Sequence, residues 1–217
     1  MIRQVIIDYL WQTLGADSTG HDPYHALRVC ANAQSLAQRD SLPYDPQVLE
    51  AAALLHDVLD HKLVTPEEAP LRAEKTRQCL LESGLKPDQC DHVFLIWDSM
   101  GFQGKGATPH MPSYEGRLVL DADRLDALGA VGIARCFAYG GKKGRLLYDP
   151  QESVQEFTDQ ESYRNHAGSS LNHFYEKLFH LKDQMQTRAG QQIAERRESY
   201  MKDFVKHFMS EWEGTDL

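Results

Sequence analysis

Apolar residues recur at intervals of three and four along most of the chain, a period near 3.6 that is typical of amphipathic α-helices. Runs of alternating polar and β-branched residues, which predict strands, are few. With 217 residues, 41% of them hydrophobic, the chain is long enough for one domain with a substantial core. We therefore expect an all-α protein whose residues 1–217 form a single domain.

Turn signals divide this helical pattern into segments. Five predicted helices precede the first glycine-rich stretch: 1–14, from Asp22-Pro23 to about 40, 46–61, from Thr65-Pro66 to Gly84, and from Pro87 to about Trp97. A long helical pattern follows at 114–138, and residues from about 161 onward predict two long amphipathic helices. The glycine-rich stretches 101–112 and 139–149 predict loops, the first of which is too long for a simple connection.

Composition argues against several classes of protein. A formal net charge of −9 is unfavourable for a general nucleic-acid surface, and no apolar run approaches the roughly 18 residues of a membrane helix. The four cysteines show no C-x-x-C spacing, so a zinc ribbon or a disulfide framework is not expected. We expect a cytoplasmic protein, either a monomer or a homodimer, with no membrane partner.

Two polar residues, His56 and Asp57, interrupt the apolar stretch LLHDVLDHK. Neighbouring residues on a helix point about 100° apart, so both can turn toward one object beside the helix, such as a metal ion. Other predicted helices offer similar ligands: His25, Asp121, Asp123 and Asp126. Mixed nitrogen and oxygen donors suit Mn²⁺, Fe²⁺, Co²⁺, Ni²⁺ or Zn²⁺. The plainer alternative is a core histidine bonded to a carbonyl, followed by an aspartate that begins the solvent face.

Five sequence blocks carry a resemblance to a known family. In chain order they are GHDPYHALRV, LLHDVLDHK, LDADRLDALGAVGIARCFAYGG, HFYEKLFHLKDQM and the closing EW. Together they resemble the HD-domain superfamily of metal-dependent phosphohydrolases, and a bacterial branch of small HD hydrolases in particular. Some members of that branch cleave nucleoside triphosphates to monophosphate and pyrophosphate. The resemblance implies a helical HD core at about 18–140 and a C-terminal helical extension at about 160–213.

The resemblance also implies a ligand set for one divalent metal ion. The H-x-L-x-V pattern selects His25 over His21, and the A-D-x-L pattern selects Asp123, with Asp121 as the alternative. With His56 and Asp57 these residues form the expected set. Among Mn, Mg, Co, Ni, Fe and Zn, manganese is favoured. For Asp126, which shares the helix face of Asp123, a salt bridge to Arg124 or Arg135 is the plainer explanation than a role beside the metal.

In the superfamily pattern the metal polarises a phosphoryl oxygen and activates water. Asp60, three residues after Asp57, is the candidate general base or water-positioning group, and Lys62 is the second catalytic candidate; an exposed helix-end acid is the alternative for Asp60. The side chains expected to bind substrate phosphate groups are His21, Lys105, Arg124, Lys142 and Lys143, with Arg145 beside them. For the last three, a solvated loop is the simpler interpretation.

The first hypothesis is therefore a metal-dependent phosphohydrolase whose partner is a small phosphorylated molecule, most plausibly a nucleoside triphosphate. A phosphomonoesterase with the same site and a non-enzymatic, metal-stabilised binding module are the alternatives. His92 and His110 fall where some HD proteins place ligands of a second metal, but neither has a partner motif. His173 and the aromatic residues near it have helical spacing and predict core packing.

Overall fold

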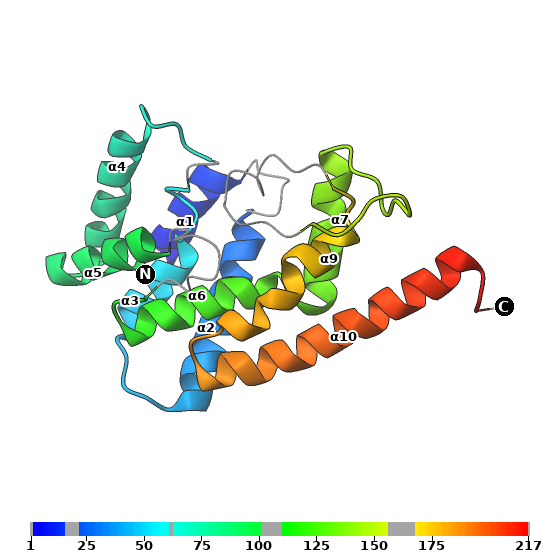
Figure 1. Ribbon diagram of the computed structural model, residues 1–217. Helices are drawn as coiled ribbons and strands as arrows, with labels where there is room; N and C mark the ends of the chain where they lie inside the picture. Colours follow the sequence, from blue (N-terminus) through cyan, green and yellow to red (C-terminus); the bar gives the residue numbers. More distant parts are fainter. Residues whose placement is uncertain (1, 16–21, 61–62, 101–109, 156–167, 217) are drawn as a thin grey trace. The chain divides into compact units, whose positions relative to one another are not determined.

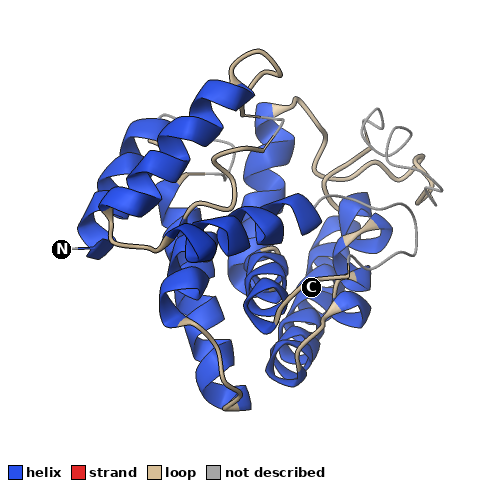
Figure 2. Cartoon of the chain, turned by 90° about the vertical axis from the view of Figure 1, so that its left-hand side faces the viewer, coloured by secondary structure: helices blue, strands red, loops and turns tan. Residues whose placement is uncertain are grey.

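The computed structural model describes residues 2–15, 22–60, 63–100, 110–155 and 168–216. Every regular element in these ranges is helical, which confirms the all-α prediction (Figure 2). The chain divides into two compact units, which we call the first unit (Met1–Gly101, Pro109–Ala122) and the second unit (Phe102–Thr108, Asp123–Leu217). None of the described helices is long and apolar enough to cross a membrane.

The first unit is built around one short and almost wholly buried helix. Its helices are α1 (Ile2–Leu14), α2 (Pro23–Asp40), α3 (Pro46–Leu54), α4 (Ala69–Glu82), α5 (Pro87–Ser99) and the first part of α6 (Tyr114–Asp126). Helices α1, α2 and α5 pack against α3, and α4 packs against α1 and α5 (Figure 1). The alanines of α3, Ala51 to Ala53, are 0% exposed and let these neighbours approach closely. The Trp97 indole of α5 donates a hydrogen bond to the Ala52 carbonyl (3.0 Å).

Helix α2 begins where the Asp-Pro pair predicted. The Asp22 side chain accepts a hydrogen bond from the His25 backbone N–H (2.8 Å), and Pro23 occupies the first helical position. This cap fixes His25 within the first turn of α2.

Helix α3 ends at Leu54, so the predicted helix over 46–61 is too long. The reason is a side-chain hydrogen bond: His56 Nδ1 lies 2.9 Å from the Ala53 carbonyl, the acceptor that Asp57 N–H would use in a continuing helix. The next backbone bonds run from Val58 to Leu55 (3.1 Å) and from Asp60 to Asp57 (3.0 Å), which are tighter turns. His56 and Asp57 therefore lie in turns after a helix, not on it.

Helix α4 begins at Ala69, four residues after the predicted start at Thr65. Residues 66–68 form a turn that is closed by reciprocal hydrogen bonds: Thr65 N–H donates to the Glu68 carboxylate and Glu68 N–H donates to the Thr65 hydroxyl, both at 3.3 Å.

The described residues of the second unit begin with the end of α6. Its further helices are α7 (Gly129–Lys142), α9 (Asn172–Glu176), the 3₁₀ turns η1 (Leu178–His180) and η2 (Lys182–Gln184), and α10 (Arg188–Glu213). The predicted single helix at 114–138 is wrong, because the chain breaks between α6 and α7. Gly129, at the break, has φ +74°, a left-handed conformation that glycine adopts without strain.

Two further predictions in the second unit need correction. Helix α7 continues to Lys142, so the predicted loop at 139–149 begins inside a helix. Of the two long C-terminal helices, only α10, with 26 residues, is found among the residues that the structure describes. The other is reduced to α9 and two 3₁₀ turns, because Lys177 (φ −141°, ψ −54°) leaves the helical region.

Several aromatic side chains form the core of the second unit, as their helical spacing predicted, but Tyr175, Tyr200 and Trp212 of the same pattern are exposed. Phe174 of α9 is 0% exposed. Its ring lies 5.9 Å from that of Phe137 in α7 and 6.1 Å from that of Phe204 in α10, measured between ring centroids. These separations are typical of packed aromatic pairs, so α7, α9 and α10 share one core.

All four cysteines are free thiols, as the spacing predicted. Burial raises the pKa of Cys30 and of Cys136 to about 12 and that of Cys79 to about 11. These thiols stay protonated near neutral pH and are poor nucleophiles.

The Asp45 cap of α3 gives a prediction for stability. Its carboxylate accepts hydrogen bonds from the backbone N–H groups of Gln47 (2.9 Å) and Val48 (3.2 Å) and from the Gln89 side chain (2.7 Å). Partial burial acts to raise the pKa of Asp45, but the hydrogen bonds together outweigh burial and hold the pKa below its usual value. We expect Asp45→Ala to lower the free energy of unfolding by about 1 kcal/mol near neutral pH.

The lowered pKa of Asp45 also predicts how the free energy of unfolding depends on pH. The charged carboxylate stabilises the fold above the unfolded-state pKa of about 3.9, and this stabilisation is lost as the pH falls through the folded-state pKa. Asp45→Asn keeps a capping side chain and removes the charge. The difference in unfolding free energy between wild type and this variant, measured by urea titration, is expected to shrink on acidification; a difference that grew would contradict the assignment.

Candidate metal centre

Three polar side chains converge inside the first unit. His25 Nε2 lies 3.2 Å from His56 Nε2, and the Asp57 carboxylate oxygens lie 3.5 Å from the first nitrogen and 3.4 Å from the second. The side chains are only 1%, 2% and 10% exposed, respectively. Two imidazole nitrogens and a carboxylate are therefore gathered at one buried point. The first turn of α2 and the turn after α3 supply them.

A backbone carbonyl orients the His56 ring. Because the Ala53 carbonyl can only accept, Nδ1 of His56 must be the protonated nitrogen in this hydrogen bond. In its neutral form the ring then carries its lone pair on Nε2, the nitrogen that lies near His25 and Asp57. This is the arrangement by which proteins prepare a histidine as a metal ligand.

The three aspartates of α6 differ in their surroundings. Among the described side chains, His25, His56 and Asp123 form a group that could hold a metal ion, and neither Asp57 nor Asp121 is part of that group. Asp57 is placed at the site by its contacts with the two histidines. Asp121 is 0% exposed. Asp126 is 2% exposed and forms an ion pair with Arg135 (2.6 Å). This is one of the two salt bridges expected for it from the sequence.

The chemistry of these donors fits a divalent metal ion. Two neutral imidazoles and carboxylates provide the mixed nitrogen and oxygen set that Mn²⁺, Fe²⁺, Co²⁺ and Zn²⁺ accept. A positive ion also offsets the cost of burying the Asp57 carboxylate. The residues present therefore suit such an ion.

Asp60 lies close to this cluster along the chain. It is half-buried, and its backbone N–H donates to the Asp57 carbonyl (3.0 Å), while its own carbonyl accepts from Leu63 (2.8 Å) and Val64 (3.1 Å). The turn is thus firmly hydrogen-bonded on both sides of Asp60. Lys62, the second catalytic candidate, lies outside the described residues, as do His21 and Lys105.

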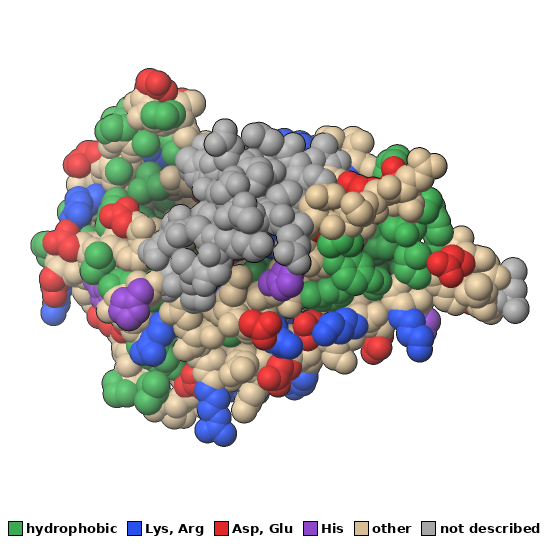
Figure 3. Space-filling model, viewed as in Figure 1, with side chains coloured by type: hydrophobic (Ala, Val, Ile, Leu, Met, Phe, Trp, Pro, Cys, Tyr) green, Lys and Arg blue, Asp and Glu red, His purple; other side chains and the backbone are tan. Residues whose placement is uncertain are grey.

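The remaining candidates for phosphate binding lie in the second unit. Arg124 donates a hydrogen bond to the Gln184 carbonyl, and Lys142 is exposed at the end of α7. Lys143 Nζ and the Arg145 guanidinium carbon lie 5.7 and 5.8 Å from the centroid of the Tyr139 ring, a compact basic group. Elsewhere, on the face drawn in Figure 3, acidic and basic side chains are interspersed among the described residues.

The histidines of the two-metal alternative do not join the cluster. His92 is half-buried in α5 and His110 is exposed, and within the described ranges neither belongs to a group that could hold a metal. Two hydrogen bonds at the ends of α3 and α6 could not be predicted from the sequence. The Ala53 carbonyl carries no side-chain signal, and Arg197, which donates to the Leu125 carbonyl, looks like one more basic residue of an amphipathic helix.

No protein-family model matches this chain. It is, however, 35% identical over 201 residues to YpgQ of Bacillus subtilis (strain 168), described as uncharacterized, and the match covers 92% of this chain and 88% of YpgQ. A solved structure of YpgQ in complex with ADP has a TM-score of 0.75 to this chain at 31% identity, covering 96% of this chain and 97% of that one.

Two other solved structures are similar over nearly their whole length. An HD-superfamily hydrolase from Bacillus thuringiensis is 41% identical with a TM-score of 0.74, and the match covers 97% of this chain and 96% of that one. A protein from Lactobacillus plantarum is 37% identical with a TM-score of 0.81, covering 98% and 97% of the two chains.

Proposed function

This chain belongs to the HD superfamily of metal-dependent hydrolases, and from that premise we propose that it cleaves a nucleoside triphosphate to nucleoside monophosphate and pyrophosphate. The observation that carries the proposal is the buried convergence of His25, His56 and Asp57. The ADP bound in the YpgQ structure supports a nucleotide as the substrate class.

In this proposal four side chains hold one divalent ion: His25, His56, Asp57 and Asp123. Once bound, the ion supplies Lewis-acid polarisation of a phosphoryl oxygen and lowers the pKa of water. The Ala53 carbonyl keeps the His56 ring in its ligand orientation. The low exposure of His25 and His56 keeps bulk water away, which strengthens electrostatic interactions within the site.

Asp60 has the role of proton acceptor. As the water oxygen forms a bond to the α-phosphorus, the bond between that phosphorus and the oxygen bridging to the β-phosphorus breaks, and pyrophosphate leaves with the bonding electrons. The water proton passes to the Asp60 carboxylate. Basic side chains are needed for the phosphates, and Lys62, Lys105 and Arg124 are the proposed ones, with His21, Lys142 and Lys143 as further candidates.

Product analysis tests the site of cleavage. We expect equal amounts of nucleoside monophosphate and pyrophosphate from a panel of ribo- and deoxyribonucleoside triphosphates with Mn²⁺, and no product with a chelator. Phosphorus NMR separates pyrophosphate from orthophosphate, and added pyrophosphate serves as a control for secondary hydrolysis. Orthophosphate with nucleoside diphosphate rejects α-phosphate cleavage, and activity confined to monophosphates makes the protein a phosphomonoesterase.

A further inference from the structure

The last turn of α6, directly after Asp123, is held by arginines within the second unit. The Arg197 guanidinium of α10 donates to the Leu125 carbonyl, 72 residues away along the chain. The Arg124 guanidinium donates to the Gln184 carbonyl of η2. The Leu125 carbonyl also accepts a hydrogen bond from the Leu128 backbone N–H (3.1 Å), and a carbonyl oxygen has two lone pairs. Arg197 therefore adds a second, charged donor to this carbonyl and places a positive charge at the negative end of the helix dipole.

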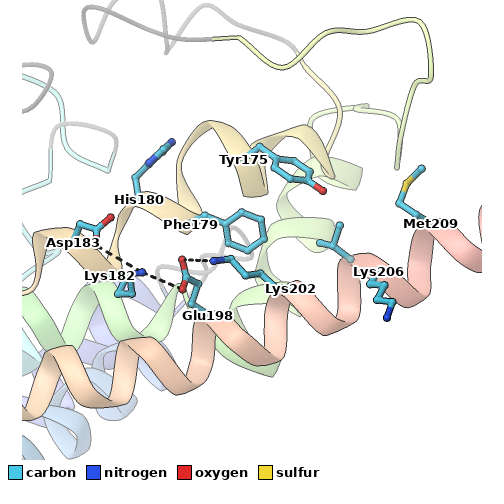
Figure 4. Close-up of a pocket in the computed structure, with 10 residues that line it drawn as sticks. Tyr175, Phe179, His180, Lys182, Asp183, Glu198, Lys202, Lys206 and Met209 are labelled. Carbon is cyan, nitrogen blue, oxygen red and sulfur yellow. Dashed lines mark ion pairs between the residues drawn. The ribbon is translucent and has the colours of Figure 1, made fainter.

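The two elements that hold this turn are themselves joined. The Glu198 carboxylate of α10 forms ion pairs with Lys182 of η2 (Nζ to oxygen, 3.4 Å) and with Lys202 of α10 (3.2 Å). The Glu198 side chain is only 9% exposed, and each of its two carboxylate oxygens pairs with one of these lysines. In Figure 4 the three charged groups form one chain of ion pairs between η2 and α10. Thus η2 and α10, joined by an ion pair, contact α6 at two consecutive residues, Arg124 and Leu125.

Packing restricts the Arg197 side chain as well. Its hydrophobic stem lies over Gly129, where an added Cβ would approach the Arg197 Cγ to 3.1 Å. Burial lowers the pKa of Arg197, and the Asp126 carboxylate opposes that effect. The Arg197 side chain thus packs against Gly129 at the start of α7, and its guanidinium contacts Leu125 at the end of α6.

We propose that Arg197 is a positioning residue for the metal centre, which holds the last turn of α6 and so fixes the side chain of Asp123 for metal binding. This inference rests on the proposed function, in which Asp123 is a metal ligand. Partners outside the ligand set that orient metal ligands typically change metal affinity by about 10- to 100-fold when lost. Arg197 acts on Asp123 through the helix backbone, so we expect the lower end of that range.

Manganese binding, followed by the EPR signal of free Mn²⁺ well below the melting temperature, tests this role. We expect Arg197→Met, which keeps the stem over Gly129, to weaken binding about tenfold. Arg197→Lys restores a donor and is expected to recover most of the affinity. The control is Arg196→Met, which removes the same charge from the adjacent, exposed position on α10.

The outcomes separate the inference from its premise. If Arg197→Met binds Mn²⁺ as wild type does, or if Arg196→Met weakens binding equally, Arg197 does not position Asp123. If wild-type binding is unchanged by Asp57→Ala, the proposed metal centre itself fails, whatever Arg197 does. Should Arg197→Met not fold, Arg124→Met removes the other contact on the same turn, and unchanged Mn²⁺ affinity in that variant overturns the inference.

Discussion

Asp57→Ala is expected to reduce kcat for metal-dependent hydrolysis of a nucleoside triphosphate by more than about 100-fold. Even an outer partner of a metal ligand costs about 10- to 100-fold when removed, and Asp57 is a proposed ligand whose oxygens lie within 3.5 Å of both imidazole nitrogens. Alanine removes both oxygens and leaves the two histidines without their carboxylate. Initial rates at saturating Mn²⁺ and substrate measure the change.

The matched control is Asp98→Ala, an exposed aspartate of α5 in the same unit. It removes one carboxylate and is expected to leave kcat unchanged. Equal losses in both variants point to a general effect of charge on the chain. If Asp57→Ala retains wild-type kcat, then Asp57 is not part of the catalytic site, and the metal centre has to be sought elsewhere.

Adding Mn²⁺ to chelator-treated protein is expected to raise the melting temperature by about 5–10 °C at a metal concentration 100 times Kd. An ion that binds only the folded state at that concentration stabilises it by about 2.7 kcal/mol, and a protein of this length shifts by about 2–4 °C per kcal/mol. His25 and His56 are 31 residues apart along the chain and are brought together by folding, so the unfolded chain is expected to be a much weaker binder. Thermal unfolding by circular dichroism across a metal titration measures the shift.

The variant Asp57→Ala provides the internal check on this shift. Its melting temperature is expected not to respond to Mn²⁺, while Asp98→Ala responds as wild type does. A metal shift that persists in Asp57→Ala places the stabilising ion outside the proposed centre. Metal stabilisation without hydrolysis of any phosphoester in wild type favours instead the non-enzymatic binding module.

Local patterns predicted the helices whose ends are set locally. Asp22 caps α2 from within the same segment, and the 3.6 period of α10 continues over 26 residues. His56 and Asp57 could be found in the same way, because they are polar residues in an apolar run, whereas His25 was selected by the resemblance to the HD superfamily. The structure brings these three side chains together, while their roles in binding and catalysis stay predictions.

The ends of other helices depend on contacts that the periodicity of the sequence does not predict. The apolar run after Leu54 looks helical, yet the His56 ring takes the Ala53 carbonyl and stops α3. Similarly, α6 ends where Arg197 reaches the Leu125 carbonyl from 72 residues away. The Leu128-Gly129 pair was a usable signal for that break, because glycine is common just past helix ends. Side-chain hydrogen bonds, one short-range and one long-range, therefore act at the helix ends on which the candidate site depends.

An anomalous difference map from a crystal soaked in Mn²⁺ tests the central claim most directly. The account predicts one strong peak, coordinated by Nε2 of His25, Nε2 of His56 and carboxylate oxygens of Asp57 and Asp123. A peak at any other set of residues, or a second peak of equal strength joined by His92 or His110, would contradict the single metal centre proposed for this hydrolase.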